Sequence, residues 1–214
     1  MHGDCKLIAF DVDGTLIEAE LWGRLNAVLD VPKERGREIF HEYLHGQVDY
    51  RTCISNLAHL WVQSGKRKED ILSVLHDFKL VPHAETTVAY LKNSYHLALI
   101  SSGFDLYVAE VAERLSVPHA YFYGTFMFNE TEQLVDINFL SERTEIEAKV
   151  DAIKDLQKRY RLEPNEIMFV GDSKNDIGAF EYTGRGVLIG EGNEDLRRNA
   201  WKQINSLDEI KNFA

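Results

Sequence analysis

The sequence predicts an α/β fold, in which a parallel sheet covered by helices on both faces forms a three-layer core and a small helical cap follows the first strand. Two observations carry this prediction. Short apolar runs alternate with longer segments of helical periodicity, as in parallel sheets that are buried on both faces. Residues 17–80 interrupt this alternation after the first run, and their apolar residues recur at helical spacing.

The expected strands of the sheet are short runs made entirely of apolar residues. Such runs lack the alternation of half-buried strands, so each should lie within a covered sheet. They span residues 7–10, 97–100, 167–170 and 187–189. A separate β-hairpin is expected over residues 121–128 and 133–139, where Tyr, Phe and Val alternate on both sides of a polar turn.

The expected helices fall into two groups. Those between the first and second strands lie near residues 21–29, after Pro32, at 50–62 and at 69–78. Those after residue 80 span residues 86–91, 105–115 and 143–160. From this division we expect a core formed by residues 1–16 and 81–214, and a cap formed by residues 17–80.

Composition and charge limit the class of protein. The chain has 214 residues and a formal net charge of −11, which argues against a protein that coats nucleic acid, since phosphate backbones bind Lys and Arg. No run of about 18 apolar residues occurs, so no membrane span is expected. The N-terminal residues do not resemble a signal peptide and there are only two cysteines, so we expect a cytoplasmic location.

An acidic segment follows the first predicted strand. Asp11 and Asp13 lie two positions apart in a segment that continues through Gly14 to Thr15. In parallel α/β sheets, ligands bind at the carboxyl ends of the strands, where this segment is expected to lie. Two acids in a turn are nevertheless common, so the functional interpretation depends on partners at the other strands.

Those partners occur in a consistent order along the chain. Ser101 follows the second apolar run, Lys149 lies in the helix before the third run, and Asp172 and Asp176 follow the third run. Each residue alone has an ordinary interpretation, as a turn serine, a solvated lysine or a helix cap. Together, at the ends of strands or in a helix that leads to one, they favour a single site.

These segments resemble the four motifs of the haloacid dehalogenase superfamily of phosphohydrolases. The matching residues are, in chain order, the segment 11–15, Ser101, Lys149 and the segment 171–176. The resemblance covers the whole chain and is greatest for the phosphoserine phosphatase group, because Glu20 stands nine positions after Asp11 and the hairpin lies where that group has one. It implies a Rossmann-like core with a helical cap.

The resemblance further implies a Mg²⁺-dependent phosphatase that passes through a phosphorylated aspartate. A carboxylate needs no base to activate it, so Asp11 is the expected nucleophile. Asp13 should protonate the leaving alcohol and then accept a proton from water. The second acid favours a phosphatase over a dehalogenase, because halide leaves without a proton. Ser101 and Lys149 should donate to phosphoryl oxygens. The expected Mg²⁺ ligands are Asp11, the backbone carbonyl of Asp13, Asp172 and, directly or through water, Asp176.

The cap departs from the phosphoserine phosphatase pattern. That group holds the substrate carboxylate with a cap arginine, whereas alignment of residues 46–50 with the matching segment places Ser55 at that position. Arg51, one helical turn earlier, is the nearby replacement. A sugar or polyol phosphate therefore fits as well as phosphoserine. The predicted substrate-binding residues are Glu20, Ser55, Ser102, Gly103 and Asn175.

Other functions stay open at this point. His41, Glu42 and His45 match the H-E-x-x-H pattern of zinc proteases, but the pattern lies in a cap helix and no third ligand stands out nearby. A phosphotransferase would use the same core with another alcohol in place of water, and a non-catalytic binding module would release no phosphate. The expected partner is a small phosphorylated metabolite, with association into a homodimer left open.

Overall fold

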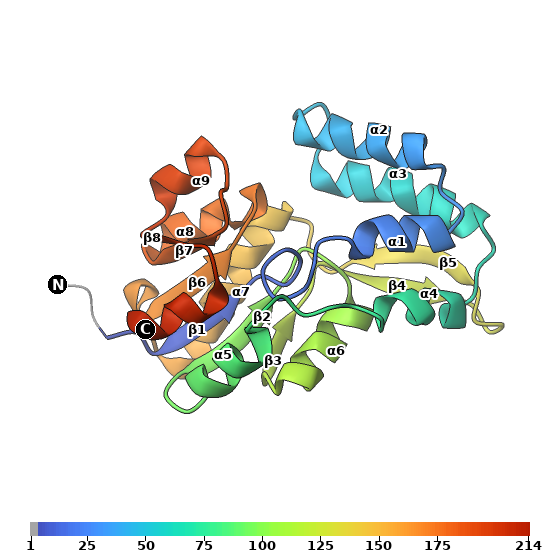
Figure 1. Cartoon of the computed structure of the whole chain (residues 1–214). Coiled ribbons are helices and arrows are strands. Elements are labelled where there is room, and N and C mark those ends of the chain that lie inside the picture. Colours follow the sequence, from blue (N-terminus) through green and yellow to red (C-terminus); the bar gives the residue numbers. More distant parts are fainter. Residues whose placement is uncertain (1–3) are drawn as a thin grey trace.

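A six-stranded parallel sheet forms the centre of the structure (Figure 1), a computed structural model that describes residues 4–214. The strand order is β3-β2-β1-β6-β7-β8, and every neighbouring pair is parallel. The strands are β1 (Leu7–Phe10), β2 (His96–Ile100), β3 (His119–Tyr121), β6 (Ile167–Gly171), β7 (Gly186–Ile189) and β8 (Lys202–Ile204). The predicted fold class is confirmed. Residues 1–3, on which the expectation of no signal peptide partly rests, lie outside the described residues.

Helices cover both faces of the sheet. In β1, Ile8 and Phe10 point into one apolar cluster, while Leu7 and Ala9 point into the other, and all four are fully buried. The first face is covered by α5 (Ala84–Leu91), α6 (Asp105–Leu115) and the 3-10 helix Leu207–Asn212. The second is covered by α7 (Glu145–Tyr160), α8 (Ile177–Thr183) and α9 (Glu194–Asn199). The result is the three-layer arrangement that the apolar runs predict.

The helices of the predicted cap follow β1 and lie together at one end of the molecule (Figure 1). They are α1 (Leu21–Val28), α2 (Lys33–Leu44), α3 (Tyr50–Gln63) and α4 (Lys68–Leu75). Asp49 caps α3 by accepting a hydrogen bond from the backbone N–H of Thr52 at 2.7 Å. Pro32 precedes α2 instead of opening it as expected, because its backbone is extended.

The hairpin β4 (Gly124–Phe128) and β5 (Leu134–Phe139) packs against these cap helices. The backbone N–H of Leu134 donates to the carbonyl of Lys66 at 3.1 Å, and that of Lys68 donates to Glu132 at 2.8 Å. Residues from the range expected to form the core therefore contact the range expected to form the cap. The division into 1–16 with 81–214 and 17–80 stays a prediction.

The sequence pattern does not indicate the two edge strands of the sheet. Tyr121 was expected in the hairpin, but it belongs to β3, because its carbonyl accepts a hydrogen bond from the backbone N–H of Ser101 at 2.9 Å. The chain turns before β4 begins. β8 contains the polar residues Lys202 and Gln203, so no apolar run marks it. Within residues 4–214, no helix is long and apolar enough to cross a membrane.

Candidate active site

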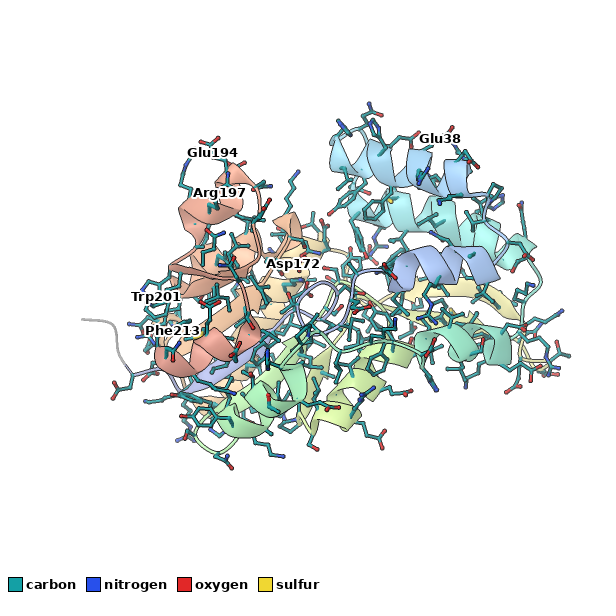
Figure 2. The ribbon with its side chains drawn as sticks, viewed as in Figure 1. Glu38, Asp172, Glu194, Arg197, Trp201 and Phe213 are labelled. Carbon is teal, nitrogen blue, oxygen red and sulfur yellow. The ribbon has the colours of Figure 1, made fainter. Side chains whose placement is uncertain are left out.

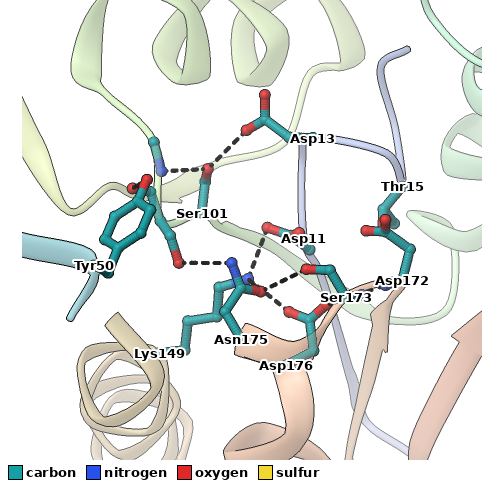
Figure 3. A network of polar contacts seen from close by, with 12 residues as sticks. Asp11, Asp13, Thr15, Tyr50, Ser101, Lys149, Asp172, Ser173, Asn175 and Asp176 are labelled. Carbon is teal, nitrogen blue, oxygen red and sulfur yellow. Dashed lines mark hydrogen bonds and ion pairs between the residues drawn. The ribbon is translucent and has the colours of Figure 1, made fainter. Parts of the chain in front are cut away.

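The polar segments after β1, β2 and β6 meet at the carboxyl edge of the sheet (Figure 3). These strands are neighbours in the order β2-β1-β6, so the segments that carry Asp11, Ser101 and Asp172 emerge next to one another. Figure 2 places Asp172 between the sheet and the cap helices. The predicted residues are thus brought together by strand order, although they are up to 161 positions apart in the chain (11 to 172).

Lys149 connects the segment after β1 with the segment after β6. Its side chain extends from α7, is 1% exposed, and its Nζ donates to Asp11 Oδ1 at 2.9 Å, Asp176 Oδ1 at 2.6 Å and Asn175 Oδ1 at 2.9 Å. Burial lowers the pKa of Lys149, but the carboxylates of Asp11 and Asp176 outweigh burial and raise the pKa above its ordinary value. The lysine is therefore a fixed positive charge in the site.

Asp176 also fixes the loop that follows β6. Its second oxygen, Oδ2, accepts hydrogen bonds from the backbone N–H groups of Asp172 and Ser173, both at 3.0 Å. The Asp176 carboxylate can approach this loop so closely only because residue 171 is a glycine, since an added Cβ there would lie 2.3 Å from Oδ2 of Asp176. The loop thus holds Asp172 in place through the backbone.

Three carboxylates form a group suited to a divalent cation. Oxygen atoms of Asp11, Asp172 and Asp176 lie within 4.8 Å of one another. Burial raises the pKa of Asp11 well above its usual range, and burial together with Asp176 raises the pKa of Asp172 to about 6. Two buried acids and one half-buried acid against one lysine leave negative charge uncompensated, and carboxylate oxygens are the ligands Mg²⁺ prefers. The donor set fits a magnesium ion.

The two residues that follow Asp13 keep Asp172 close to this segment. Thr15 Oγ1 donates to Asp172 Oδ1 at 3.0 Å. Gly14 has a positive φ of 80°, and an added Cβ there would lie 2.4 Å from Asp172 Oδ2. A side chain at this position would therefore be strained and would also displace the carboxylate.

Asp13 points away from the other carboxylates, toward β2 and α6. Its Oδ2 accepts hydrogen bonds from Tyr107 at 2.5 Å and from Ser101 Oγ at 3.3 Å, while its buried Oδ1 has no hydrogen-bond partner among the described residues. Burial raises the pKa of Asp13, although the bonds from Tyr107 and Ser101 oppose the rise. A carboxyl group with a raised pKa and one free buried oxygen suits proton transfer.

The loop after β2 contacts both the cap and the loop after β6. The backbone N–H of Gly103 donates to Ser101 Oγ at 2.9 Å, and Asn175 Nδ2 donates to Ser102 Oγ at 3.2 Å. Tyr50, at the start of α3, donates through its hydroxyl to the Ser102 carbonyl at 2.9 Å. Three of the predicted substrate-binding residues therefore lie in one network with Lys149 (Figure 3).

A cavity of about 830 Å³ opens above this network. Asp11, Asp13 and Asp172 lie at its floor, and Ser102, Gly103 and Asn175 line it from the core. Glu20 lines it from the start of α1, as predicted for a residue that faces the substrate. The cavity is therefore bounded by the aspartates of the core on one side and by the helices α1, α2 and α3 on the other.

Ser55 is not brought to this cavity, in contrast to the expectation. It is exposed on α3, and the neighbouring residue Ile54 lines the cavity instead.

The histidines of the zinc-protease pattern do not form a metal site. The rings of His41 and His45 are exposed and stack with their centroids 3.8 Å apart. Within residues 4–214 the one group of three or more potential metal ligands is formed by Asp11, Asp172 and Asp176.

Three aromatic residues that the sequence motifs do not indicate also contact or line the site. They are Tyr107, which donates to Asp13; Tyr50, which donates to the loop after β2; and Trp22, which lines the same cavity as Asp13. Tyr107 could have been suspected, because it lies one turn after Phe104 on a helix that starts at the site. Trp22 and Tyr50 carry no local signal.

Comparisons with known proteins agree with this geometry. Residues 5–184 match the family described as haloacid dehalogenase-like hydrolases. The chain is 27% identical over 184 residues to a phosphoserine phosphatase of Methanocaldococcus jannaschii, covering 84% of this chain and 82% of that protein. It is 24% identical over 185 residues to a phosphoserine phosphatase of Archaeoglobus fulgidus. That match covers 86% of this chain, and this chain spans only 52% of the length of that protein.

Solved structures share the fold. A phospho-aspartyl intermediate analogue of phosphoserine phosphatase superposes with a TM-score of 0.81 at 24% identity, covering 99% of both chains. A substrate-bound phosphoserine phosphatase complex superposes with a TM-score of 0.82 at 23% identity, covering 99% of this chain and 100% of that one.

Proposed function

The chain belongs to the haloacid dehalogenase-like hydrolases, and we propose that it is a Mg²⁺-dependent phosphatase that hydrolyses a small phosphomonoester through a phosphorylated Asp11. The observation that carries the proposal is the setting of the Asp11 carboxylate. It is buried, lies 2.9 Å from the Lys149 ammonium, and shares the floor of a large cavity with Asp172. Relatives and structures named phosphoserine phosphatase support the same class of reaction.

Asp11 supplies the nucleophile. Its Oδ1 is oriented by Lys149, and its carboxylate lies at the floor of the cavity, where a phosphate group can reach it. A bond forms between a carboxylate oxygen and phosphorus while the bond from phosphorus to the alcohol oxygen breaks. A carboxylate needs no base to activate it, and the Lys149 ammonium opposes the rise in the pKa of Asp11 that burial causes.

Asp13 moves the proton in both steps. It donates its proton to the departing alcohol oxygen, then removes a proton from the water that attacks the phosphorylated Asp11, and phosphate is released. The hydrogen bonds from Tyr107 and Ser101 to one oxygen hold the carboxyl group still, so that the other oxygen is left for the reacting groups.

The remaining polar groups hold the phosphoryl oxygens and the metal. In this proposal Lys149, Ser101 and backbone N–H groups near Gly103 and Gly14 would donate to the oxygens of a bound phosphate. Asp11, the Asp13 carbonyl, Asp172 and Asp176 would hold Mg²⁺, which when bound supplies positive charge against the charge of the phosphoryl group. Association into a homodimer and a cytoplasmic location stay predictions.

Release of inorganic phosphate from a panel of phosphorylated metabolites, measured with Mg²⁺, tests the proposal. The wild-type protein should release phosphate and lose this activity with a chelator, and Asp11→Asn should be inactive. Asp195→Asn, at an exposed position on α9, is the matched control and should keep full activity. Activity that survives in Asp11→Asn would mean a different nucleophile. A phosphorylated product formed from an added alcohol would identify a phosphotransferase.

A further inference from the structure

The cavity above Asp11 continues far beyond the space that a phosphate group needs. It extends between the core loops and the helices α1, α2 and α3. On α2 the lining positions are 33, 36, 37, 40, 43 and 44, which is the spacing of one helix face. These positions cover about 16 Å of helix at 1.5 Å per residue. The cavity is therefore elongated along α2.

The walls of this extension are apolar. They are formed mainly by Trp22, Ala27, Val31, Phe40, Ile54 and Leu57. Gly23 and Gly36 lie inside α1 and α2 and also line the cavity, although glycine within a helix costs about 1 kcal/mol relative to alanine. A Cβ at Gly23 would contact nothing within 4 Å, so the missing side chain leaves open space in the cavity.

Large apolar side chains also lie exposed where the cavity meets solvent. Phe40 is 40% exposed and Leu44 is 58% exposed, and both line the cavity. Soluble proteins expose such side chains singly, but a pair on one helix face beside an apolar cavity indicates a binding surface. A ligand with an apolar chain would cover them.

The cations of the lining do not match the carboxylate of an amino acid. Arg24 is held by Asp77, whose carbonyl it contacts at 2.7 Å, and Lys33, Arg37 and Lys174 are exposed on the surface. The cap position at which the phosphoserine phosphatase pattern has an arginine carries Ser55, which is exposed outside the cavity. No buried cation of the described cap helices therefore faces the space where a serine carboxylate would lie.

Resting on the phosphatase function proposed above, we propose that the substrate is the phosphomonoester of an extended apolar alcohol. Its phosphate lies on Asp11, and its alkyl part runs along the apolar wall from Trp22 beside Asp13 toward Phe40 and Leu44. Burial of each methylene against these side chains stabilises the complex, whereas the carboxylate of phosphoserine would lose water without a buried cation of the cap helices as its partner.

Hydrolysis of n-alkyl phosphates from ethyl to octyl tests this inference, because the leaving alcohol changes in apolar area while its acidity stays nearly constant. We expect kcat/KM to rise by about threefold for each added methylene, slightly below the value for complete burial. O-phosphoserine should be hydrolysed more slowly than hexyl phosphate. Calorimetric titration of the Asp11→Asn protein gives a readout free of turnover, and hexyl phosphate should bind more tightly than ethyl phosphate.

Two leucines of similar exposure test whether the dependence on chain length arises in this cavity. Leu44 lines the cavity and is 58% exposed, whereas Leu140 lies outside the lining and is 54% exposed. Leu44→Ser should lower the ratio of octyl to ethyl phosphate hydrolysis by about fivefold, since part of the apolar contact is lost. Leu140→Ser should leave this ratio unchanged.

The outcomes separate the two proposals. If no ester of any kind releases phosphate with Mg²⁺, the phosphatase function is wrong. If phosphate is released but the rate does not rise with chain length, or phosphoserine is the better substrate, the phosphatase function stands and the apolar substrate is wrong. The same conclusion follows if Leu44→Ser and Leu140→Ser give equal ratios.

Discussion

Replacing Lys149 by methionine should destabilise the metal-free protein. The lysine side chain is 1% exposed, and its ammonium group lies 2.9 Å from Asp11 and 2.6 Å from Asp176. Methionine keeps much of the apolar stem but leaves two buried carboxylates without their cation. Removing one partner of a buried ion pair costs about 3–5 kcal/mol, because the remaining charge is left in a poorly solvated place.

The expected change in Tm follows from this cost. For a protein of 214 residues, each kcal/mol lowers the Tm by about 2–4 °C, so Lys149→Met should lower it by about 6–20 °C. Mg²⁺ should relieve part of the loss, because a divalent cation offsets the same carboxylates. The rise in Tm that Mg²⁺ causes should therefore be larger in the variant than in the wild-type protein.

Calorimetric unfolding with and without Mg²⁺ measures both effects. Lys154→Met is the matched control, because Lys154 lies on the same helix, is 43% exposed and contacts Asp151 at 3.5 Å. An exposed pair of this kind contributes less than about 1 kcal/mol, so the control should shift by at most a few degrees. Equal shifts for the two variants would refute the stabilising role of Lys149, and an unchanged response to Mg²⁺ would refute its link to the metal site.

Further predictions concern Asp13, Gly14 and Asp172. Tyr107→Phe removes a hydrogen bond to the Asp13 carboxylate that is worth about 1.5–3 kcal/mol, so the pKa of Asp13 should rise. Because Asp13 must be protonated to donate to the leaving alcohol, the alkaline limb of the pH profile of kcat/KM should move up by about 1–2 units. Tyr182→Phe loses an equally short bond away from the site and should leave the profile unchanged. Gly14→Ala should weaken Mg²⁺ binding by at least about tenfold in calorimetric titration, because its Cβ meets Asp172 at 2.4 Å; unaltered binding would contradict this role. The pKa of Asp172 rises from 3.8 to about 6 on folding, so the protonated form stabilises the metal-free protein and this stability is lost as the pH rises through that range. The increase in Tm caused by Mg²⁺ should accordingly be larger at pH 7 than at pH 5, and the opposite order would contradict the assignment.

The sheet and its catalytic edge are largely readable from the sequence. The apolar runs at residues 7–10, 97–100 and 167–170 have no polar alternation, so they can only be strands or helices covered on all sides, and their shortness favours strands. The polar residues directly after them are then forced to one edge, because parallel strands share a direction. Lys149 alone would be interpreted as a solvated lysine, and its predicted role depends on its combination with the other segments and on their resemblance to the haloacid dehalogenase motifs.

The residues of the cap helices that line the cavity are harder to predict, because a shift of one position along a helix moves a residue to another face. Ser55 and Ile54 are neighbours on α3, yet one is exposed and the other is buried and lines the cavity. Successive residues in an α-helix are rotated by about 100°, so a shift of one position in an alignment exchanges solvent for cavity. The predicted contact of Ser55 with substrate depends on an alignment anchored at residues 46–50, so a shift of one position changes the residue that faces the cavity.

Tyr107 illustrates a second limit. Its position on α6 fits the apolar face of an amphipathic helix, and the ring is indeed buried in the apolar cluster, at 1% exposure. The hydroxyl group reaches past that cluster to Asp13 only because Gly103 has no side chain, since an added Cβ would lie 1.6 Å from the tyrosine oxygen. A pairing that depends on a small residue in another loop has no periodic signal in the sequence.

The wall of the cavity beside Asp13 is held by residues that lie about a hundred positions apart. The ring of Trp22 on α1 lies 5.6 Å from Phe104 and 6.2 Å from Trp61, and Phe104 lies 4.8 Å from Phe126 of the hairpin. Phe104 directly follows the loop that carries Ser101, so the helix that lines the substrate cavity and the loop that contacts Asp13 are packed on one aromatic cluster. Because closely packed rings resist small displacements, movement of α1 would be transmitted to the loop that contacts Asp13. In the proposed mechanism, this would couple the choice of substrate to the position of the proton donor.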